Sequence, residues 1–231
     1  SLTAALSLLD QPPFGFLSRA NMPTDLGEGR AEVTSTIHVP LMRRPAREDI
    51  EFDVRGTLRD LRSDRLVKGR VLTADSLNLV AVPGQVQVSG DLRLGAARAN
   101  ATWTLPLGQP GAGSSVRGRA RLDADLGREF LAGLGEGVLS GAGSADFEVT
   151  LKPGQPPALK VTSDLSGAVL RIPQLSWSKA ASARGRLDLS GELSQPVRFE
   201  RLHLSAPGLS ATGGLRRAGG GTLDPLALSD L

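Results

Sequence analysis

Ser176 and Lys179 are separated by the Ser-x-x-Lys spacing of penicillin-binding enzymes, in which serine is the acylated nucleophile. That chemistry also needs Ser-Asp-Asn and Lys-Thr-Gly segments, and the chain contains neither. The run 208–213 misses the Gly-x-Ser-x-Gly nucleophile elbow by one residue and alternates like a strand. A turn with a packed Trp177 is therefore favoured over a catalytic serine, and no catalytic residue is predicted.

Metal and cofactor sites are equally poorly supported. The two histidines, His38 and His203, are 165 positions apart, and the chain has no cysteine. Asp123 and Asp125 are spaced for Ca²⁺ binding, but they precede an apolar run at helical spacing, which favours a helix cap. The Gly-x-Gly pairs at 111–113 and 135–137 lack the third glycine of a dinucleotide loop. We expect no metal, no cofactor and no enzymatic activity.

The charge of the chain argues against nucleic-acid binding. Twenty-seven basic and 24 acidic residues give 231 residues a net charge of +3. Arg117, Arg119 and Arg121 line one face of an alternating segment, but no aromatic residues interleave there for base stacking. This arginine row fits protection of a strand edge or contact with anionic lipid headgroups equally well.

Strict alternation of apolar and polar residues, the period of a β-strand, dominates the chain. Glu200 and Arg201 interrupt the phase by one residue, which predicts a β-bulge. Pro- and Gly-rich turns separate most of the segments, so we predict a mainly β protein, a long antiparallel meander of roughly 12 strands. The alternating segments are 31–39, 50–59, 77–81, 86–94, 97–105, 116–123, 145–152, 159–161, 168–172, 183–190, 199–202 and 209–215.

Two segments have helical spacing instead. Residues 2–9 end at a Pro-Pro pair, and residues 126–134 follow a candidate N-cap at Asp125, with Gly133 or Gly135 as the end. Both helices are short and are expected to lie against the sheet or its rim. The predicted organisation is a short helix and lead-in over 1–28, then a section of one β domain over 29–231 with a helical insertion near 125–135.

The apolar strand faces suggest a curled sheet with space inside. Only eight residues are aromatic, whereas a sandwich or closed sheet of this size is normally filled by aromatics. Gly56, Gly90, Gly118 and Gly185 share the apolar phase, so they favour bending and an unfilled open groove, or half-pipe. Glycines that relieve crowding in an ordinary sandwich are the alternative. About 12 strands at ~4.8 Å spacing would expose more apolar surface than a soluble monomer tolerates, which predicts an apolar occupant.

The inward phase of the strands defines the predicted lining of this groove. It consists of aliphatic and aromatic residues that alternate with polar ones along each segment. The predicted lining residues are Val33, Ile37, Phe52, Val54, Leu77, Leu79, Val86, Val88, Leu92, Leu94, Trp103, Phe147, Val149, Leu159, Val161, Leu170, Leu187, Leu189, Leu202 and Leu204.

Several segments resemble the AsmA-like proteins, particularly the YhdP branch and the related TamB type. They are Pro40-Leu41 after an alternating strand, the strand 50–58, and the Leu-x-Trp-x-Lys run 175–179 followed by the strand 183–189. The resemblance extends from about Pro12 to the C-terminus. It implies a repeating β-groove similar to the bridge-like lipid-transfer proteins, of which this chain is one section.

The resemblance also implies a location and a role. Members of the family are anchored in the bacterial inner membrane, extend through the periplasm, and are implicated in phospholipid movement and outer-membrane barrier function. We therefore expect a periplasmic chain that binds phospholipid acyl chains, with its membrane anchor outside these residues and with envelope proteins as possible partners. The alternative is a non-enzymatic scaffold whose apolar trough binds a protein segment during outer-membrane assembly.

Overall fold

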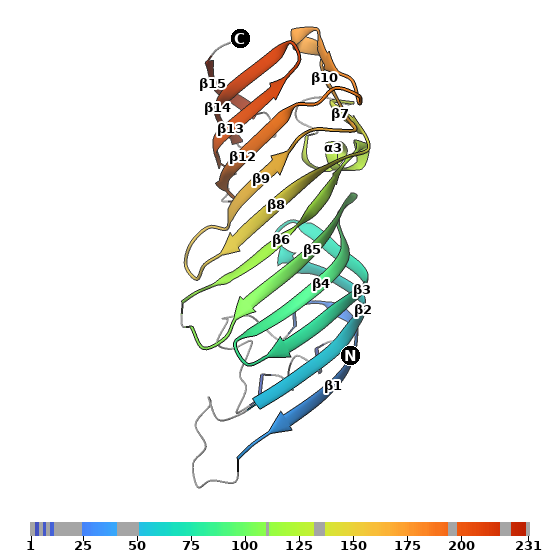
Figure 1. Cartoon of the computed structure of the whole chain (residues 1–231), viewed down its shortest axis with the longest axis vertical. Coiled ribbons are helices and arrows are strands. Elements are labelled where there is room, and N and C mark those ends of the chain that lie inside the picture. Colours follow the sequence, from blue (N-terminus) through green and yellow to red (C-terminus); the bar gives the residue numbers. More distant parts are fainter. Residues whose placement is uncertain are drawn as a thin grey trace. The chain divides into compact units, whose positions relative to one another are not determined.

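The chain folds mainly as antiparallel strands, as the alternation predicts (Figure 1). The computed structural model describes residues 25–40, 51–109, 111–131, 137–193, 198–217 and 223–229, with isolated positions before residue 12. One sheet has the order β1-β2-β3-β4-β5-β6-β8-β9-β12-β13-β14-β15, and a smaller one the order β11-β10-β7. The large sheet is a meander in which strands neighbour one another in chain order, so its edges are β1 and β15.

The strands are bounded as follows, with turns of two residues at several of the hairpins. They are β1 (Glu28–His38), β2 (Glu51–Val67), β3 (Arg70–Val82), β4 (Gln85–Leu94), β5 (Ala97–Pro106), β6 (Ser114–Leu122), β7 (Leu139–Gly141), β8 (Gly143–Leu151), β9 (Ala158–Ser163), β10 (Ala168–Ile172), β11 (Trp177–Lys179), β12 (Arg186–Glu192), β13 (Arg198–Ala206), β14 (Leu209–Arg217) and β15 (Leu223–Ser229). The 3₁₀ turn η3 (Pro173–Leu175) joins β10 to β11.

The structure differs from the predicted meander at β10. Residues 168–172 pair with β7 and β11 in the smaller sheet and do not take a place between β9 and β12. Their apolar–polar alternation is too short to show which sheet they join, because pairing depends on contacts distant in sequence. The long β2–β3 hairpin also extends beyond the predicted segments, through the turn at Lys68–Gly69.

The helix α3 (Ala124–Phe130) begins two residues earlier than predicted. Its N-cap is Asp123, whose side chain accepts a hydrogen bond of 3.1 Å from the Leu126 amide. Asp125 instead lies in the first turn, where its carboxylate pairs with Arg98 and Arg128. The helix ends at Phe130, with Leu131 as its C-cap. The predicted end at Gly133 or Gly135 lies outside the described residues, as does most of the predicted helix 2–9.

The predicted bulge is confirmed. The pairing of β13 with both neighbours shifts by one residue between Phe199 and Leu202, the position at which the alternation slips. Because side chains alternate between the two faces, this extra residue keeps Phe199 and Leu202 on the same face of the sheet.

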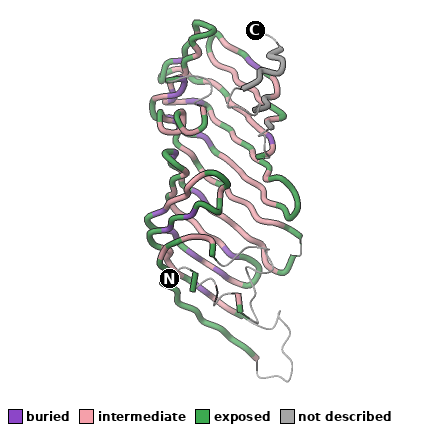
Figure 2. The backbone as a smooth tube through the Cα atoms, turned by 180° about the vertical axis from the view of Figure 1, so that it is seen from behind, coloured by how far each residue is buried: buried purple, intermediate pink, exposed green. Residues whose placement is uncertain are grey.

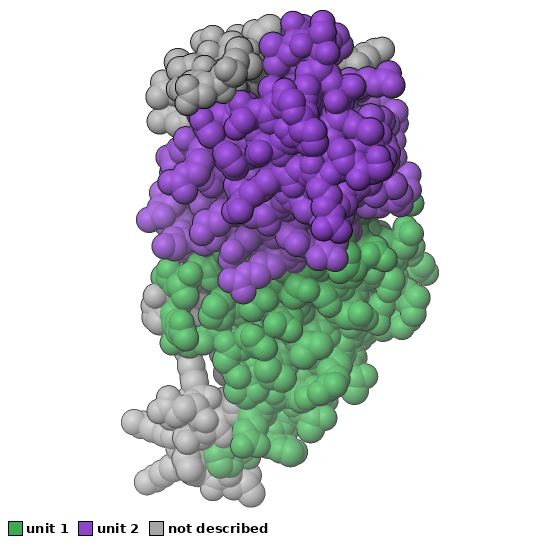
Figure 3. Space-filling model, turned by 45° about the horizontal axis from the view of Figure 1, so that its top comes forward, with its two compact units in different colours: residues 1–95, 100–115 green, residues 96–99, 116–231 purple. Residues whose placement is uncertain are grey.

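The chain divides into two compact units (Figure 3). Unit 1 comprises residues 1–95 and 100–115, and unit 2 comprises 96–99 and 116–231. Each unit has its own apolar clusters on one face of its strands. In unit 1 the buried residues centre on Val54, Leu77 and Leu79, and in unit 2 they centre on Leu139, Leu165 and Ala168.

Three of the inward glycines do not border empty space, contrary to the sequence prediction. A Cβ on Gly56 would lie 2.5 Å from the Glu32 carbonyl oxygen, and one on Gly185 would lie 2.6 Å from that of Ser205. A Cβ on Gly90 would lie 2.9 Å from Leu77. These glycines therefore allow neighbouring strands and side chains to approach closely, which is the second established use of a glycine within a strand.

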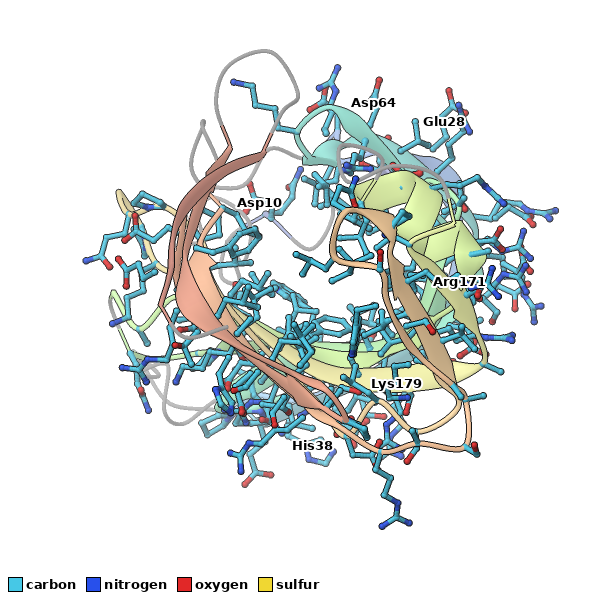
Figure 4. All side chains as sticks on the ribbon, turned by 90° about the horizontal axis from the view of Figure 1, so that it is seen from above. Asp10, Glu28, His38, Asp64, Arg171 and Lys179 are labelled. Carbon is cyan, nitrogen blue, oxygen red and sulfur yellow. The ribbon has the colours of Figure 1, made fainter. Side chains whose placement is uncertain are left out.

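The polar face of unit 2 carries ion pairs across its strands. Arg117 donates to Glu148 at 2.7 Å, and Arg119 donates to Asp146 at 2.8 Å, both from β6 to β8. Arg121 lies 3.6 Å from Asp123. In Figure 4 most nitrogen and oxygen atoms lie on the outer side of the ribbons, and the inner side shows mostly carbon. The predicted alternation thus separates a charged face from an apolar one.

Candidate functional site: an apolar face and its covered end

The apolar face of unit 2 consists of three rows of side chains that run across the strands. Register places Phe147 opposite Val161, Val161 opposite Leu189, and Leu189 opposite Leu202. A second row contains Val149, Leu159, Gly191 and Phe199, and a third contains Ala145, Ser163, Leu187, Leu204 and Ala211. Neighbouring rows are two residues apart along each strand, or about 7 Å.

The first two rows are only half-covered. We call their large side chains the apolar strip: Phe147, Val149, Leu159, Val161, Leu189, Phe199 and Leu202. Every one of these side chains is partly exposed, although each lies within a hydrogen-bonded strand. A soluble protein rarely leaves such a continuous set of large apolar side chains open to water, so the strip is a candidate binding surface.

The third row packs against other segments of its own chain, although Leu187 and Leu204 stay partly exposed, as the side chains of the strip do. Leu187 and Leu204 pack against a buried cluster of Leu122, Leu139, Ala145, Leu165 and Ala168, and Val161 of the strip packs against it too. Leu126 and Leu131 of the α3 region and Leu170 of β10 pack against the same cluster. Leu170 was predicted to line the groove as part of the meander, but it belongs to the smaller sheet that covers this row.

In unit 1 the predicted lining residues also share one face, with uneven exposure. Val54, Leu77, Leu79 and Val86 are buried, in clusters with Phe52, Val88, Leu92 and Trp103. Leu94 is half-buried opposite Leu72. On the edge strand β1, Val33 and Ile37 are 41% and 43% exposed, and Figure 2 shows this strand as exposed over nearly its whole length. The four buried residues are therefore core and not open lining.

Lys179 is the unusual buried charge of unit 2. Its side chain is 2% exposed, and its ammonium donates to the carbonyl oxygens of Leu165 at 2.6 Å, Ala168 at 2.8 Å and Ala180 at 3.1 Å. An ammonium has three protons, so these bonds use its full donor capacity. Burial lowers the pKa of Lys179, and the nearby Asp164 carboxylate opposes this with a smaller upward effect on the pKa.

Ser176 and Lys179, which share the Ser-x-x-Lys spacing, have different partners in the structure. The Lys179 ammonium bonds to carbonyl oxygens, while Ser176 is exposed, adopts a left-handed backbone with φ 50°, and donates its amide to Pro173. Trp177 packs at the β11 end of this turn, where its indole nitrogen donates to the Pro207 carbonyl at 2.9 Å. The distinctive Leu-x-Trp-x-Lys segment thus holds two parts of unit 2 together, a role that sequence spacing did not indicate.

The other candidate residues form no constellation within the described part of the chain. No three His, Asp or Glu side chains there gather as metal ligands. His38 lies in unit 1 with Nδ1 3.9 Å from a Glu51 carboxylate oxygen, and His203 lies in unit 2 on the strand β13. One concave site of unit 1 has a largely charged lining that includes Asp25, Glu28, Arg62, Asp64 and Arg65. The apolar strip is the better-defined surface.

Comparison with known proteins adds no assignment. No family model, curated protein or solved structure matches the chain. Within the described ranges, no helix has the combined length and apolarity that crossing a membrane would require. The functional argument therefore depends on the apolar face itself.

Proposed function

We propose that this chain is a non-enzymatic section of a periplasmic lipid-conducting protein, similar to the AsmA-like family, that holds phospholipid acyl chains on its apolar face. The observation that carries the proposal is the apolar strip of unit 2, seven large side chains from four strands that are all partly exposed. In the intact protein, a membrane anchor outside these residues would place the section between the inner and outer membranes.

Hydrocarbon is the occupant that best suits the strip. Moving an acyl chain into water costs about 0.8 kcal/mol per CH₂, so a two-chain lipid does not cross an aqueous space freely. Transfer from a bilayer to Val, Leu and Phe side chains exchanges one apolar medium for another, with little change in free energy. The rows run across the strands, so a chain lying along a row meets apolar side chains continuously, and no polar anchor in the rows opposes sliding.

Charge pairing on the opposite face is consistent with lipid binding on the apolar face. The arginines of β6 are paired with Glu148, Asp146 and Asp123, so the row of arginines on this strand is solvated and neutralised. Such paired arginines offer few free charges to a polyanion. A lipid headgroup would remain in water beside the open strip, and only the chains would need to enter it.

Photo-crosslinking tests which face meets lipid. A photoreactive phenylalanine analogue replaces Phe147, in the strip, and the control replaces Thr162, which neighbours Asp146 on the polar face. After incubation with palmitoyl-oleoyl phosphatidylcholine vesicles and irradiation, we expect phospholipid adducts at position 147 and none at 162. Equal labelling at both positions contradicts the proposal. Adducts to a co-expressed envelope protein at 147, without lipid, would favour the protein-binding scaffold.

A further inference from the structure

The strand β1 of unit 1 has a paired edge and an open edge. Among the described strands its single neighbour is β2, so the other edge presents a row of backbone N–H and C=O groups. Nine of its eleven residues are exposed, as Figure 2 shows along the strand. Such an edge is a template for pairing with another strand unless the chain protects it.

This edge lacks the features that usually prevent pairing. Residues 28–38 contain no proline and no lysine, and the irregularity in the β1–β2 register lies at the start of the strand, between Glu28 and Arg30. Charges that point toward the apolar face would also block a partner strand. The residues of that phase are all uncharged, namely Ala31, Val33, Ser35, Ile37 and, directly after the strand, Val39.

Two apolar rows of unit 1 run from its core to this edge and end exposed. Val33 lies opposite Gly56, which lies opposite the buried Leu79. Ile37 lies opposite Phe52, which packs against the cluster that contains Val54, Leu79, Ala81 and Val86. A strand added to β1 would therefore cover Val33 and Ile37 from the open side while it completed the backbone hydrogen bonds.

The sequence of β1 is complementary to a second copy of itself. When two copies run antiparallel with Ser35 opposite Ser35, Val33 of one copy lies opposite Ile37 of the other, and Glu32 lies opposite His38. A shift of two residues in either direction places Ser35 opposite Val33 or Ile37 and separates Glu32 from His38. In their own chain these two residues have long contacts of 3.9 Å, Glu32 with Arg59 and His38 with Glu51.

We propose that β1 pairs antiparallel with β1 of a second copy of this chain, in a symmetric dimer centred on Ser35. A contact with this symmetry closes on itself, so it gives a dimer and not a filament. It places the apolar phases of both copies on the same side of one continuous sheet. The dimer would thus extend the apolar face of unit 1 across the symmetry axis, and its formation needs no lipid.

Single cysteines test the register, because the chain has none of its own. Ser35→Cys places two thiols opposite each other, with about 5 Å between their Cα atoms, which a disulfide can bridge. The control, Val33→Cys, lies on the same face, but its two thiols would be about 14 Å apart along the strands. Under mild copper–phenanthroline oxidation, we expect several-fold more linked dimer from Ser35→Cys. Equal linking of the two variants, or no linking, overturns the register.

Analytical ultracentrifugation tests the dimer without oxidant. The wild type should sediment as a dimer at concentrations at which Val33→Lys is monomeric, because this lysine puts a charge on the apolar phase of the edge. The control Thr34→Lys, on the polar face, should weaken dimerisation several-fold less, and circular dichroism checks that both variants are folded. A monomeric wild type, or an unchanged Val33→Lys dimer, refutes the pairing. Linking of Ser35→Cys to a co-expressed envelope protein, without linked dimer, would refute it in favour of a different partner strand.

Discussion

The Lys179 ammonium lies 2.6 Å from the carbonyl oxygen of Leu165, a residue held in a left-handed conformation 14 positions earlier in the chain. The contact joins the end of β11 to the loop before β10. It gives the Leu165 carbonyl a buried donor outside the strand pairing. A lysine, with three protons on a long stem, serves three carbonyls that point toward one another. This end of the apolar face in unit 2 therefore depends on a buried ammonium whose three protons bond to backbone carbonyls.

Replacing Lys179 with methionine should destabilise the chain by about 1–3 kcal/mol, because the carbonyls of Leu165, Ala168 and Ala180 then lose a buried donor. Methionine keeps most of the apolar stem. Urea unfolding followed by circular dichroism measures the change. The matched control is Lys160→Met, at an exposed position on the polar face of β9, where the expected effect is within about 0.5 kcal/mol. Equal effects of the two substitutions would show that the carbonyl contacts contribute nothing.

The same lysine predicts a dependence of stability on alkaline pH. Burial lowers its pKa below the ordinary value of 10.5, so the unfolded chain binds the proton more tightly than the folded one. The unfolding free energy should therefore rise as pH increases from the lowered pKa toward 10.5. Urea titrations between pH 8 and 10.5 measure this slope, and Lys179→Met should abolish it. A fall in stability that disappears in the variant would mean that the folded protein instead favours the charged form.

Leu189 lies in the middle of the apolar strip, so an aspartate there should block lipid and leave the fold intact. Both Leu189 and Leu187, two residues earlier, are partly exposed, but Leu187 also packs against the buried cluster. We expect Leu189→Asp to lose most bound phospholipid in native mass spectrometry, with a wild-type melting temperature within a few degrees. Leu187→Asp should lower the melting temperature markedly, because it places a charge against the buried cluster. Normal lipid binding by Leu189→Asp would remove the strip from the binding surface.

The strand period and the bulge at Glu200–Arg201 could be predicted because they are local properties of the chain. A side chain alternates with its neighbours whichever strand it pairs with, and an extra residue changes that phase at once. The small sheet could not be predicted, since the partners of residues 168–172 lie near residues 139 and 179. The contacts of Lys179 could not be predicted for the same reason. Its spacing to Ser176 can be read from the sequence, but its hydrogen bond to the Leu165 carbonyl depends on the tertiary structure.

Asp123 and Asp125 offer a direct comparison between a cap and an ion pair. Asp123→Ala removes the acceptor of the Leu126 amide and should cost about 1 kcal/mol, the usual effect of losing an N-cap. Asp125→Ala removes pairs with Arg98 and Arg128 and should cost less, because partly exposed ion pairs contribute little. Adding 0.5 M salt should weaken the contribution of Asp125 and leave that of Asp123 almost unchanged. A larger loss of stability in Asp125→Ala than in Asp123→Ala would indicate that Asp125 is the N-cap, as the sequence predicts.

Gly185 tests whether the inward glycines leave space or permit close approach. Alanine there would place a Cβ 2.6 Å from the Ser205 carbonyl oxygen and 3.1 Å from the Leu165 side chain, so a strand must move to admit it. Where a backbone tolerates the exchange, Gly→Ala stabilises by about 0.4–1 kcal/mol through the unfolded chain. At Gly185 the crowding should outweigh that gain and give a net loss of about 1–3 kcal/mol in urea unfolding. A stabilised Gly185→Ala variant would instead show that this glycine borders a hollow, as the alternation alone had suggested.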